Sequence, residues 1–366
     1  MSGSVSASGE RNVAAPAQLG DPLGEQRELL AGRALTVLPA RGVIWFEGPD
    51  ASEFLSRMLS RTPDPAAGAS CESLVLDPNG HVRFAVQVVS AGTGYWLLVT
   101  PGLTESLMSW AESMRFRLRF EVRDRSDDFR EVAWFGHPAW CPALRPEGVW
   151  RDPWGSEPQG SWRSAPAGAA DAEGWTLQVG LLPVSGLSDA LGRAEAVGAS
   201  RAGWAALNAL RLGVARPCQD TEGDPRLLPH EVDWLRTAVQ LGKGCYPGQE
   251  TVSKVHNLGH PPRRLTLLQL DGAPDIARGA SVRLGAQEVG QVTSAAVHWE
   301  LGPIALALLR RCTPVGAQLL VEDGDRWVSA AQEVVVPPDA GGAARGSVGA
   351  LRSARQVRGS RRRPLH

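Results

Sequence analysis

The spacing of hydrophobic residues changes near residue 262, and this change divides the chain into two folded parts. Before this point, stretches with apolar residues at helical spacing alternate with short runs of strand type. From Arg263 to about Val336 the apolar residues occur in short alternating runs separated by Gly and Pro turns. The pattern predicts an α+β body over residues 20–262, followed by a small C-terminal β-barrel or sandwich over residues 263–336.

The body is predicted to combine hairpins with helices. Asp21 followed by Pro22 is typical of a helix start, and this helix is expected to reach Leu30. A hairpin, with strands at 73–76 and 82–89, is expected about the turn at residues 77–80. Further strands are predicted at 35–38, 43–46, 95–99 and 116–122, and further helices at 51–59, 103–114 and 201–212. Strands that pair through hairpins favour mixed or antiparallel sheets, in two subdomains, over a doubly wound parallel sheet.

Three segments lack this regular patterning. Residues 1–19 are rich in Ser, Ala and Gly, residues 337–366 are rich in Gly, Ala, Ser and Arg, and both are predicted to be disordered tails. Residues 142–175 are rich in Pro, Gly and Ser and contain four tryptophans. This segment is predicted to be an insertion or long crossover whose tryptophans anchor a loop and have no functional role.

Composition limits the classes of partner. The chain has 366 residues, 43% of them hydrophobic, and a formal net charge of −1. Residues 337–366 contain seven arginines and one aspartate, a net charge of +6, so the remainder carries −7. An acidic body argues against a nucleic-acid grip by phosphate neutralisation, although the arginine-rich tail could touch RNA or an acidic membrane.

Cysteine usage and hydropathy indicate a cytoplasmic protein. Five cysteines are scattered without framework spacing, and no charged, apolar leader is evident at the N-terminus. The longest uncharged stretch, residues 84–104, is interrupted by Gln, Ser, Gly and Pro. We therefore expect two strands and a turn there, and no membrane span.

The run Lys243-Gly244-Cys245-Tyr246-Pro247-Gly248-Gln249-Glu250 is the strongest candidate for chemistry. Lys243 and Lys254 are the only two lysines of the chain. Cys245 is expected just before a helix that starts near Gly248 and ends at Gly259, and both the helix amides and the Lys243 ammonium would favour a thiolate there. The alternative is a small buried cysteine, with Lys254 forming an ordinary exposed ion pair with Glu250.

Two other kinds of site use the same cysteine. Cys218, Cys245, His256 and His260 supply metal-ligand types, but the cysteines lie 27 positions apart, so no metal site is expected. Cys245 with His230 or His256 has the residue types of a nucleophilic pair but no local motif.

Acidic groups upstream of the motif add a different possibility. Asp220 and Glu231 could accept hydrogen bonds from the exocyclic amine and ring N–H of a pterin, against the simpler reading as solvated loop carboxylates.

The run from Lys243 to Glu250 resembles the K-G-C-[YF]-x-G-Q-E motif of the YgfZ-type folate-binding proteins, a family that includes a mitochondrial iron–sulfur assembly factor. Residues 42–51, 228–231 and 251–259 also resemble this family, so the likeness covers about residues 21–336. The family is similar in fold to the glycine-cleavage T-protein, an aminomethyltransferase with a central tetrahydrofolate pocket and a C-terminal barrel. The transferase carries an aspartate after the glycine of the second hairpin strand, whereas residues 80–85 here have no carboxylate. That departure disfavours one-carbon transfer by the T-protein mechanism.

The resemblance implies a tetrahydrofolate-binding accessory protein that supports maturation or repair of iron–sulfur enzymes, such as radical enzymes that modify tRNA. It implies that Cys245 supplies a thiolate at the pocket mouth and that Lys243 keeps it ionised or pairs with the folate glutamate tail. The residues expected to contact the cofactor are Lys243, Tyr246, Gln249, Glu250, Glu231 and Asp220. Two other functions stay open: a folate-dependent methyl- or aminomethyltransferase, and a metal or cluster carrier that uses Cys245 with another cysteine.

Overall fold

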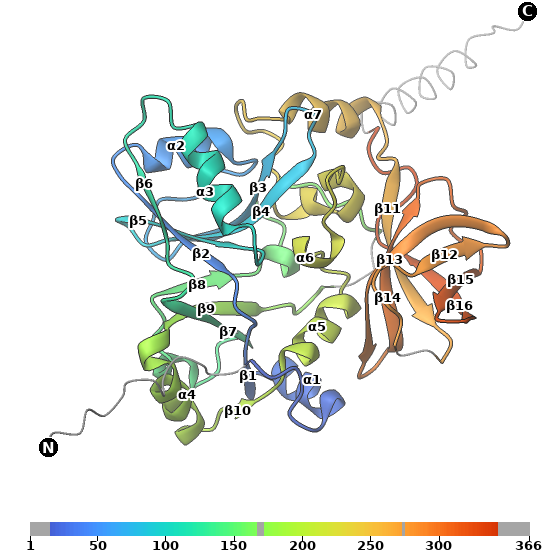
Figure 1. The fold of residues 1–366 in the computed structure, drawn as a ribbon, viewed down its shortest axis with the longest axis horizontal. Helices are drawn as coiled ribbons and strands as arrows, with labels where there is room; N and C mark the ends of the chain where they lie inside the picture. Colours follow the sequence, from blue (N-terminus) through green and yellow to red (C-terminus); the bar gives the residue numbers. More distant parts are fainter. Residues whose placement is uncertain (1–14, 167–171, 273–274, 343–366) are drawn as a thin grey trace, which may run out of the picture.

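The computed structural model describes residues 15–166, 172–272 and 275–342. Two five-stranded sheets and a closed six-stranded barrel make up this part of the chain (Figure 1). The body is α+β and the C-terminal part is a barrel, as the hydrophobic pattern predicts.

One sheet has the strand order β3-β4-β5-β2-β6, and all of its pairs are antiparallel. Its strands are β2 (Gly42–Glu47), β3 (Ser70–Leu76), β4 (Val82–Ser90), β5 (Gly94–Val99) and β6 (Glu121–Asp124). The helices α2 (Ala51–Met58) and α3 (Thr104–Ser113) cover one face, where Phe46, Phe54 and Phe120 form a shared hydrophobic cluster. The other face is free to pack on the second sheet.

The second sheet has the order β10-β1-β7-β9-β8, antiparallel except where β10 pairs with β1. Its strands are β1 (Ala34–Val37), β7 (Phe129–Phe135), β8 (Gly148–Arg151), β9 (Leu177–Pro183) and β10 (Ser200–Arg201). One cluster joins Trp150 and Val179 of this sheet to Leu98 of the first sheet and Leu207 of α5. The helices of this half are α1 (Pro22–Leu30), α4 (Leu187–Ala196) and α5 (Trp204–Gly213).

Three short helices, η1 (Cys141–Ala143), η2 (Pro153–Gly155) and η3 (Val184–Gly186), lie in the connections after β7, β8 and β9. Four helices lead from α5 to the barrel: α6 (Gln219–Glu222), η4 (Pro229–Val232), η5 (Trp234–Arg236) and α7 (Gln249–Leu258). The barrel strands are β11 (Arg263–Leu270), β12 (Ser281–Leu284), β13 (Gln287–His298), β14 (Gly302–Arg310), β15 (Leu319–Asp323) and β16 (Arg326–Val334). One hydrophobic cluster joins Leu265 and Leu306 of the barrel to Trp234 of η5 and Leu74 of β3, so the barrel packs directly on the body.

Two sequence-based expectations differ from the structure. The strand expected at 116–122 is β6 at Glu121–Asp124, because the chain turns at Phe116, whose φ is 51°. The segment 142–175 is more than a loop, since β8 within it pairs with β9 and extends the second sheet.

The structure describes residues 15–19 and 337–342 of the two predicted tails. Pro16 and Ala17 accept hydrogen bonds from the first turn of α5, and Gly342 donates to Val255 of α7. Residues 1–14 and 343–366 lie outside the described residues.

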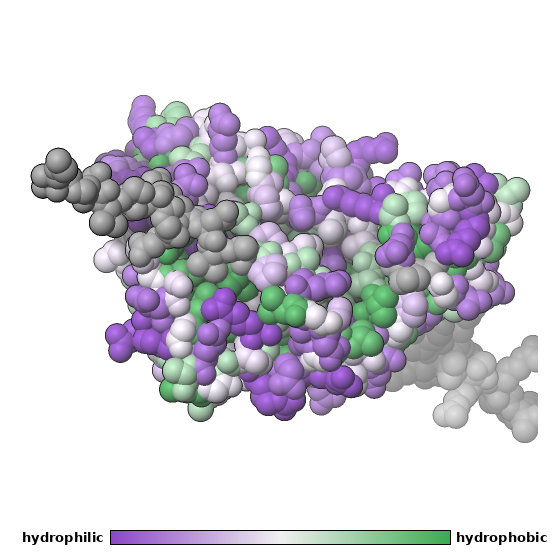
Figure 2. All heavy atoms as spheres, turned by 60° about the horizontal axis from the view of Figure 1, so that its bottom comes forward, coloured by the Kyte–Doolittle hydropathy of each residue, from purple (hydrophilic) through white to green (hydrophobic). Residues whose placement is uncertain are grey.

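One face of the molecule is mainly hydrophilic. Figure 2 shows the face at the bottom of Figure 1, where hydrophilic side chains predominate and small hydrophobic patches lie between them. Over the described ranges, every helix is too short or too polar to cross a membrane.

Candidate functional site

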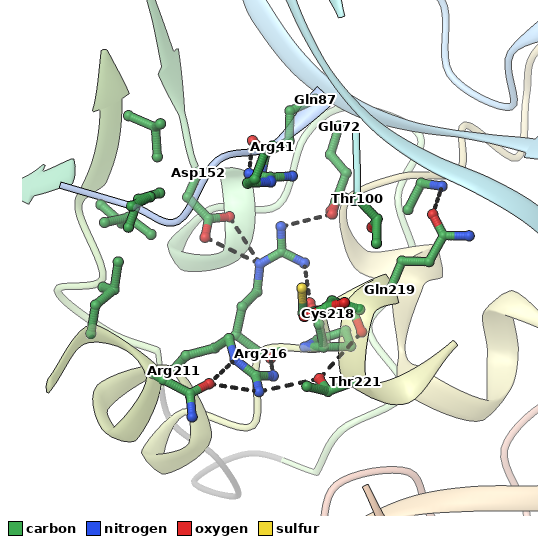
Figure 3. A pocket seen from close by; sticks show the side chains of 18 of the residues that line it. Arg41, Glu72, Gln87, Thr100, Asp152, Arg211, Arg216, Cys218, Gln219 and Thr221 are labelled. Atoms are coloured by element: carbon green, nitrogen blue, oxygen red, sulfur yellow. Dashed lines mark hydrogen bonds and ion pairs between the residues drawn. The ribbon is translucent and has the colours of Figure 1, made fainter. Parts of the chain in front are cut away.

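A central cavity of about 470 Å³ lies between the two sheets and α5 (Figure 3). Its walls come from β3 and β4 of one sheet, from β8 and β9 of the other, and from the segment 204–221. Each of the two sheets contributes a face to the cavity, so segments that are far apart in the sequence meet there. Its volume falls in the range of roughly 300–1,000 Å³ that is usual for small-molecule sites.

Aromatic and aliphatic side chains line much of the cavity. Trp150, Trp175 and Trp204 lie on its wall together with Leu207 and Val179. Trp150 and Trp175 are themselves buried and held in place by hydrogen bonds from their indole N–H groups, to the Cys71 carbonyl and to Asp152. Such a wall favours a flat, partly apolar ligand.

Arg216 joins the two sheets at the cavity wall (Figure 3). Its Nη2 donates to Glu72 of β3 at 2.7 Å, and its Nε donates to both oxygens of Asp152 at 3.1 Å. Burial by itself would lower the pKa of Arg216, but Asp152 and Glu72 outweigh burial and hold the pKa above its usual range. Because Glu72 also accepts from Thr237 and Asp152 from Trp175, both carboxylates already have protein donors.

A second arginine connects the cavity to the barrel. Arg211 of α5 forms an ion pair with Glu222 of α6 at 3.0 Å. Glu222 in turn accepts hydrogen bonds from the hydroxyls of Thr293 and Ser294 on β13. The position of α6, and with it the cavity-lining Cys218 and Asp220, is therefore fixed by the barrel.

The motif at 243–250 lies outside the cavity lining, at the tip of the β3–β4 hairpin. Gly248 adopts φ 78° and packs so closely on the hairpin that an added Cβ would lie 2.5 Å from the Asp77 carbonyl oxygen. The side-chain Nε2 of Gln249 donates to the Lys243 carbonyl at 2.9 Å, which closes the motif into a compact turn. Tyr246 is buried in the same hydrophobic cluster as Trp234, which lines the cavity.

Cys245 is exposed, and Lys243 lies beside it. The Lys243 Nζ is 5.0 Å from the centre of the Tyr246 ring, a cation–π contact. Partial burial lowers the pKa of Lys243 to about 8, although a thiolate at Cys245 would act in the opposite direction. The structure thus brings Lys243, Cys245 and Tyr246 together and leaves the sulfur accessible to solvent.

The other predicted residues are dispersed. Asp220 lines the cavity. Glu231 is fully buried, and its carboxylate accepts from Arg263 and from the Leu228 amide. Glu250 is exposed on α7, and the structure shows no ion pair between Glu250 and Lys254 within its described part.

The residues considered for a metal site do not converge. Over the described ranges, no group of three or more His, Cys, Asp and Glu side chains is placed to hold a metal ion. His256 packs edge-on against Trp162, and His260 is directed to the Ala340 carbonyl. Burial lowers the pKa of His230 to about 3, which makes this imidazole neutral across the physiological range.

Sequence reasoning missed most of the cavity lining. Trp150 and Trp175 were expected to anchor a loop, and Arg216 and Glu72 carried no motif. A faint signal for Arg216 existed in the run Ala215-Arg216-Pro217-Cys218-Gln219-Asp220, where a lone arginine follows a buried helix and precedes an acidic turn. Its partners are 64 and 144 positions away, so only the tertiary fold reveals the pairing.

Known proteins resemble this chain over most of its length, although no protein-family model matches it. An aminomethyltransferase of Moorella thermoacetica is 27% identical over 311 residues, which cover 80% of this chain and 83% of the relative. The crystal structure of glycine cleavage system aminomethyltransferase T from Bartonella henselae aligns with a TM-score of 0.66 at 20% identity, covering 88% of this chain and 94% of that one. The chain therefore has the aminomethyltransferase-like fold expected from its sequence, and both of these similar proteins carry the name aminomethyltransferase.

Proposed function

We propose that the central cavity binds a reduced folate, tetrahydrofolate in particular. The observation that carries the proposal is the cavity itself, whose volume suits a pterin-sized ring and whose wall presents Trp150, Trp175 and Trp204. Asp220 on α6 adds an exposed carboxylate that suits the ring N–H and amino donors of a pterin. The carboxylate acceptor and the aromatic lining both fit this ligand.

We further propose that the chain is a YgfZ-type accessory protein for iron–sulfur enzymes, including those that modify tRNA. Ala85, at the end of the stretch where the transferase resemblance expects an aspartate, lines the cavity without a carboxylate. The nearby Glu72 and Asp152 are both held in ion pairs by Arg216, so neither carboxylate is free to face a ligand. A folate held here is therefore better suited to binding than to aminomethyl transfer.

In this proposal Cys245 acts on the outside of the molecule. Its exposed sulfur, beside the half-buried Lys243, is accessible to a protein client but does not line the cavity. The thiol and the folate would then occupy separate places, since Cys245 does not line the cavity, and the two would be connected only through the hydrophobic cluster that contains Tyr246 and Trp234.

A folate-dependent aminomethyltransferase is the second candidate, because the relatives by sequence and by structure carry that name. Turnover of an aminomethyl donor with tetrahydrofolate would favour it. Tetrahydrofolate binding without turnover favours the accessory role.

Calorimetric titration with tetrahydrofolate tests the folate proposal. We expect the wild type to bind and Trp204→Leu to bind about tenfold more weakly, because the variant loses an aromatic wall of the cavity. Trp299→Leu is the matched control, since Trp299 is partly exposed at the barrel and lies outside the cavity lining. Equal affinity of Trp204→Leu and wild type would place the ligand elsewhere.

Complementation of a strain that lacks the protein tests the accessory role. Cys245→Ser should lower the activity of dependent iron–sulfur enzymes several-fold, because it removes the exposed thiol of the motif. Cys312→Ser controls for loss of an exposed thiol elsewhere and should behave as the wild type. Full complementation by Cys245→Ser would remove the thiol from the proposal.

A further inference from the structure

Arg41 lines the cavity from the turn that precedes β2, and its side chain is 19% exposed. Both of its side-chain hydrogen bonds are made by one nitrogen, Nη1. That atom donates to Gln87 Oε1 on β4 at 3.1 Å and to Glu131 Oε2 on β7 at 3.0 Å. The guanidinium therefore bridges the two sheets at the cavity. It differs from Arg216, whose Nε and Nη2 both bond to carboxylates, because Nε and Nη2 of Arg41 remain available to a ligand.

Glu131 fixes the position of this arginine. The carboxylate is buried, and burial raises its pKa while Arg41 opposes the change. A buried carboxylate needs a cation beside it, so Arg41 is held in one place before any ligand arrives. Pre-ordering of this kind lowers the entropy cost of binding.

The groups that remain free on this side of the cavity are hydrogen-bond donors. Within the described residues, Arg41 Nε and Nη2 make no hydrogen bond, and neither does the Gln87 amide nitrogen, because the Gln87 oxygen is turned to Arg41. Arg41 and Gln87 appear near each other at one edge of the cavity in Figure 3. On the Arg216 side, by contrast, the carboxylates are already bound to protein donors. On this side of the cavity, a ligand acceptor thus finds donors at Arg41 and Gln87.

We propose that Arg41 and Gln87 form a donor pair that binds an oxygen acceptor of the ligand, either a ring carbonyl or a carboxylate. The pair would decide which end of the ligand enters between the sheets. This inference rests on the proposed folate-binding function of the cavity and assigns the residues that orient the ligand within it.

Two variants change the donors with little change in the fold. Arg41→Lys keeps a cation beside Glu131 but replaces the planar fork of donors by a single ammonium. Gln87→Glu keeps an oxygen that accepts from Arg41 but places a second oxygen where the amide donor was. Arg130→Lys is the control, because Arg130 is the neighbour of Glu131 on β7, bonds only to backbone carbonyls and does not line the cavity.

Affinities are measured by calorimetry for tetrahydrofolate and for a tetrahydropterin that lacks the aminobenzoyl-glutamate tail, with melting temperatures of the free proteins as the structural readout. We expect Arg41→Lys and Gln87→Glu each to bind tetrahydrofolate about tenfold or more weakly, with Arg130→Lys unchanged. Equal losses for both probes assign the acceptor to the ring carbonyl, and a loss for tetrahydrofolate alone assigns it to a carboxylate.

Wild-type affinity for both probes in both cavity variants would overturn the donor pair while leaving the folate proposal intact. A lower melting temperature without a change in affinity would also overturn it, because it would show a purely structural role. Failure of the wild type to bind either probe would remove the folate proposal and this inference with it.

Discussion

At the scale of the residue, Lys243 combines an unusual position with an unusual ionisation. Its ammonium lies against the Tyr246 ring and next to an exposed thiol. Partial burial removes water from the charged form, so the pKa falls to about 8 from an ordinary value of 10.5. The neutral amine is then present at a pH where other lysines remain charged, and such an amine is a nucleophile and a proton acceptor.

Pulse labelling with an acetylating reagent measures this ionisation, because the chain has only two lysines to follow by mass spectrometry. We expect the rate at Lys243 to rise with pH and to reach half of its plateau near pH 8, since the neutral fraction grows as pH passes the folded pKa. In urea the midpoint should move up toward 10.5, the value of a solvated lysine. A folded-state rate that still climbs steeply above pH 10 would contradict the lowered pKa.

At the scale of the element, the sequence predicted helix ends that are set by residues next to them in the chain. Asp21 does cap α1 through a bond to the Gly24 amide, and α7 starts after Gly248 and ends before Gly259. The expected strand at 116–122 was misplaced because the alternation of Phe116, Leu118 and Phe120 mimics a strand. Phe120 instead packs on Phe46 and Phe54, while Phe116 stands 89% exposed at a left-handed turn.

The candidate site was predictable only where it is local. The grouping of Lys243, Cys245 and Tyr246 follows from the motif at 243–250, since these residues are neighbours in sequence. The cavity could not, because Arg216 meets Glu72 and Asp152 only after both sheets have folded and packed. Glu231 illustrates the limit, since its sequence context indicates a loop acid whereas the fold buries it beside Arg263.

At the scale of the whole molecule, Arg263 joins the barrel to the body. It is the first residue of β11, and it pairs with Glu231 of η4 at 2.7 Å and with Asp224. Glu231 is completely buried, so its charge depends on this arginine for compensation. The barrel in turn supplies the hydroxyls that hold Glu222 and α6 at the cavity. The shape of the cavity therefore depends on the position of the barrel relative to the body.

Arg263→Met should therefore lower the free energy of unfolding by about 3–5 kcal/mol, because it leaves a buried carboxylate without its cation. Urea denaturation measures the loss, and Arg326→Met is the control, since the exposed Arg326–Asp323 pair of the barrel should contribute less than about 1 kcal/mol. The double variant Arg263→Met, Glu231→Gln should recover part of the stability, because the buried residue 231 is then neutral and Asp224, whose side chain is 30% exposed, can be hydrated. If the double variant is no more stable than Arg263→Met alone, packing of the Arg263 side chain, rather than its charge, holds the barrel on the body. The cavity would then tolerate neutralisation of the Arg263–Glu231 pair.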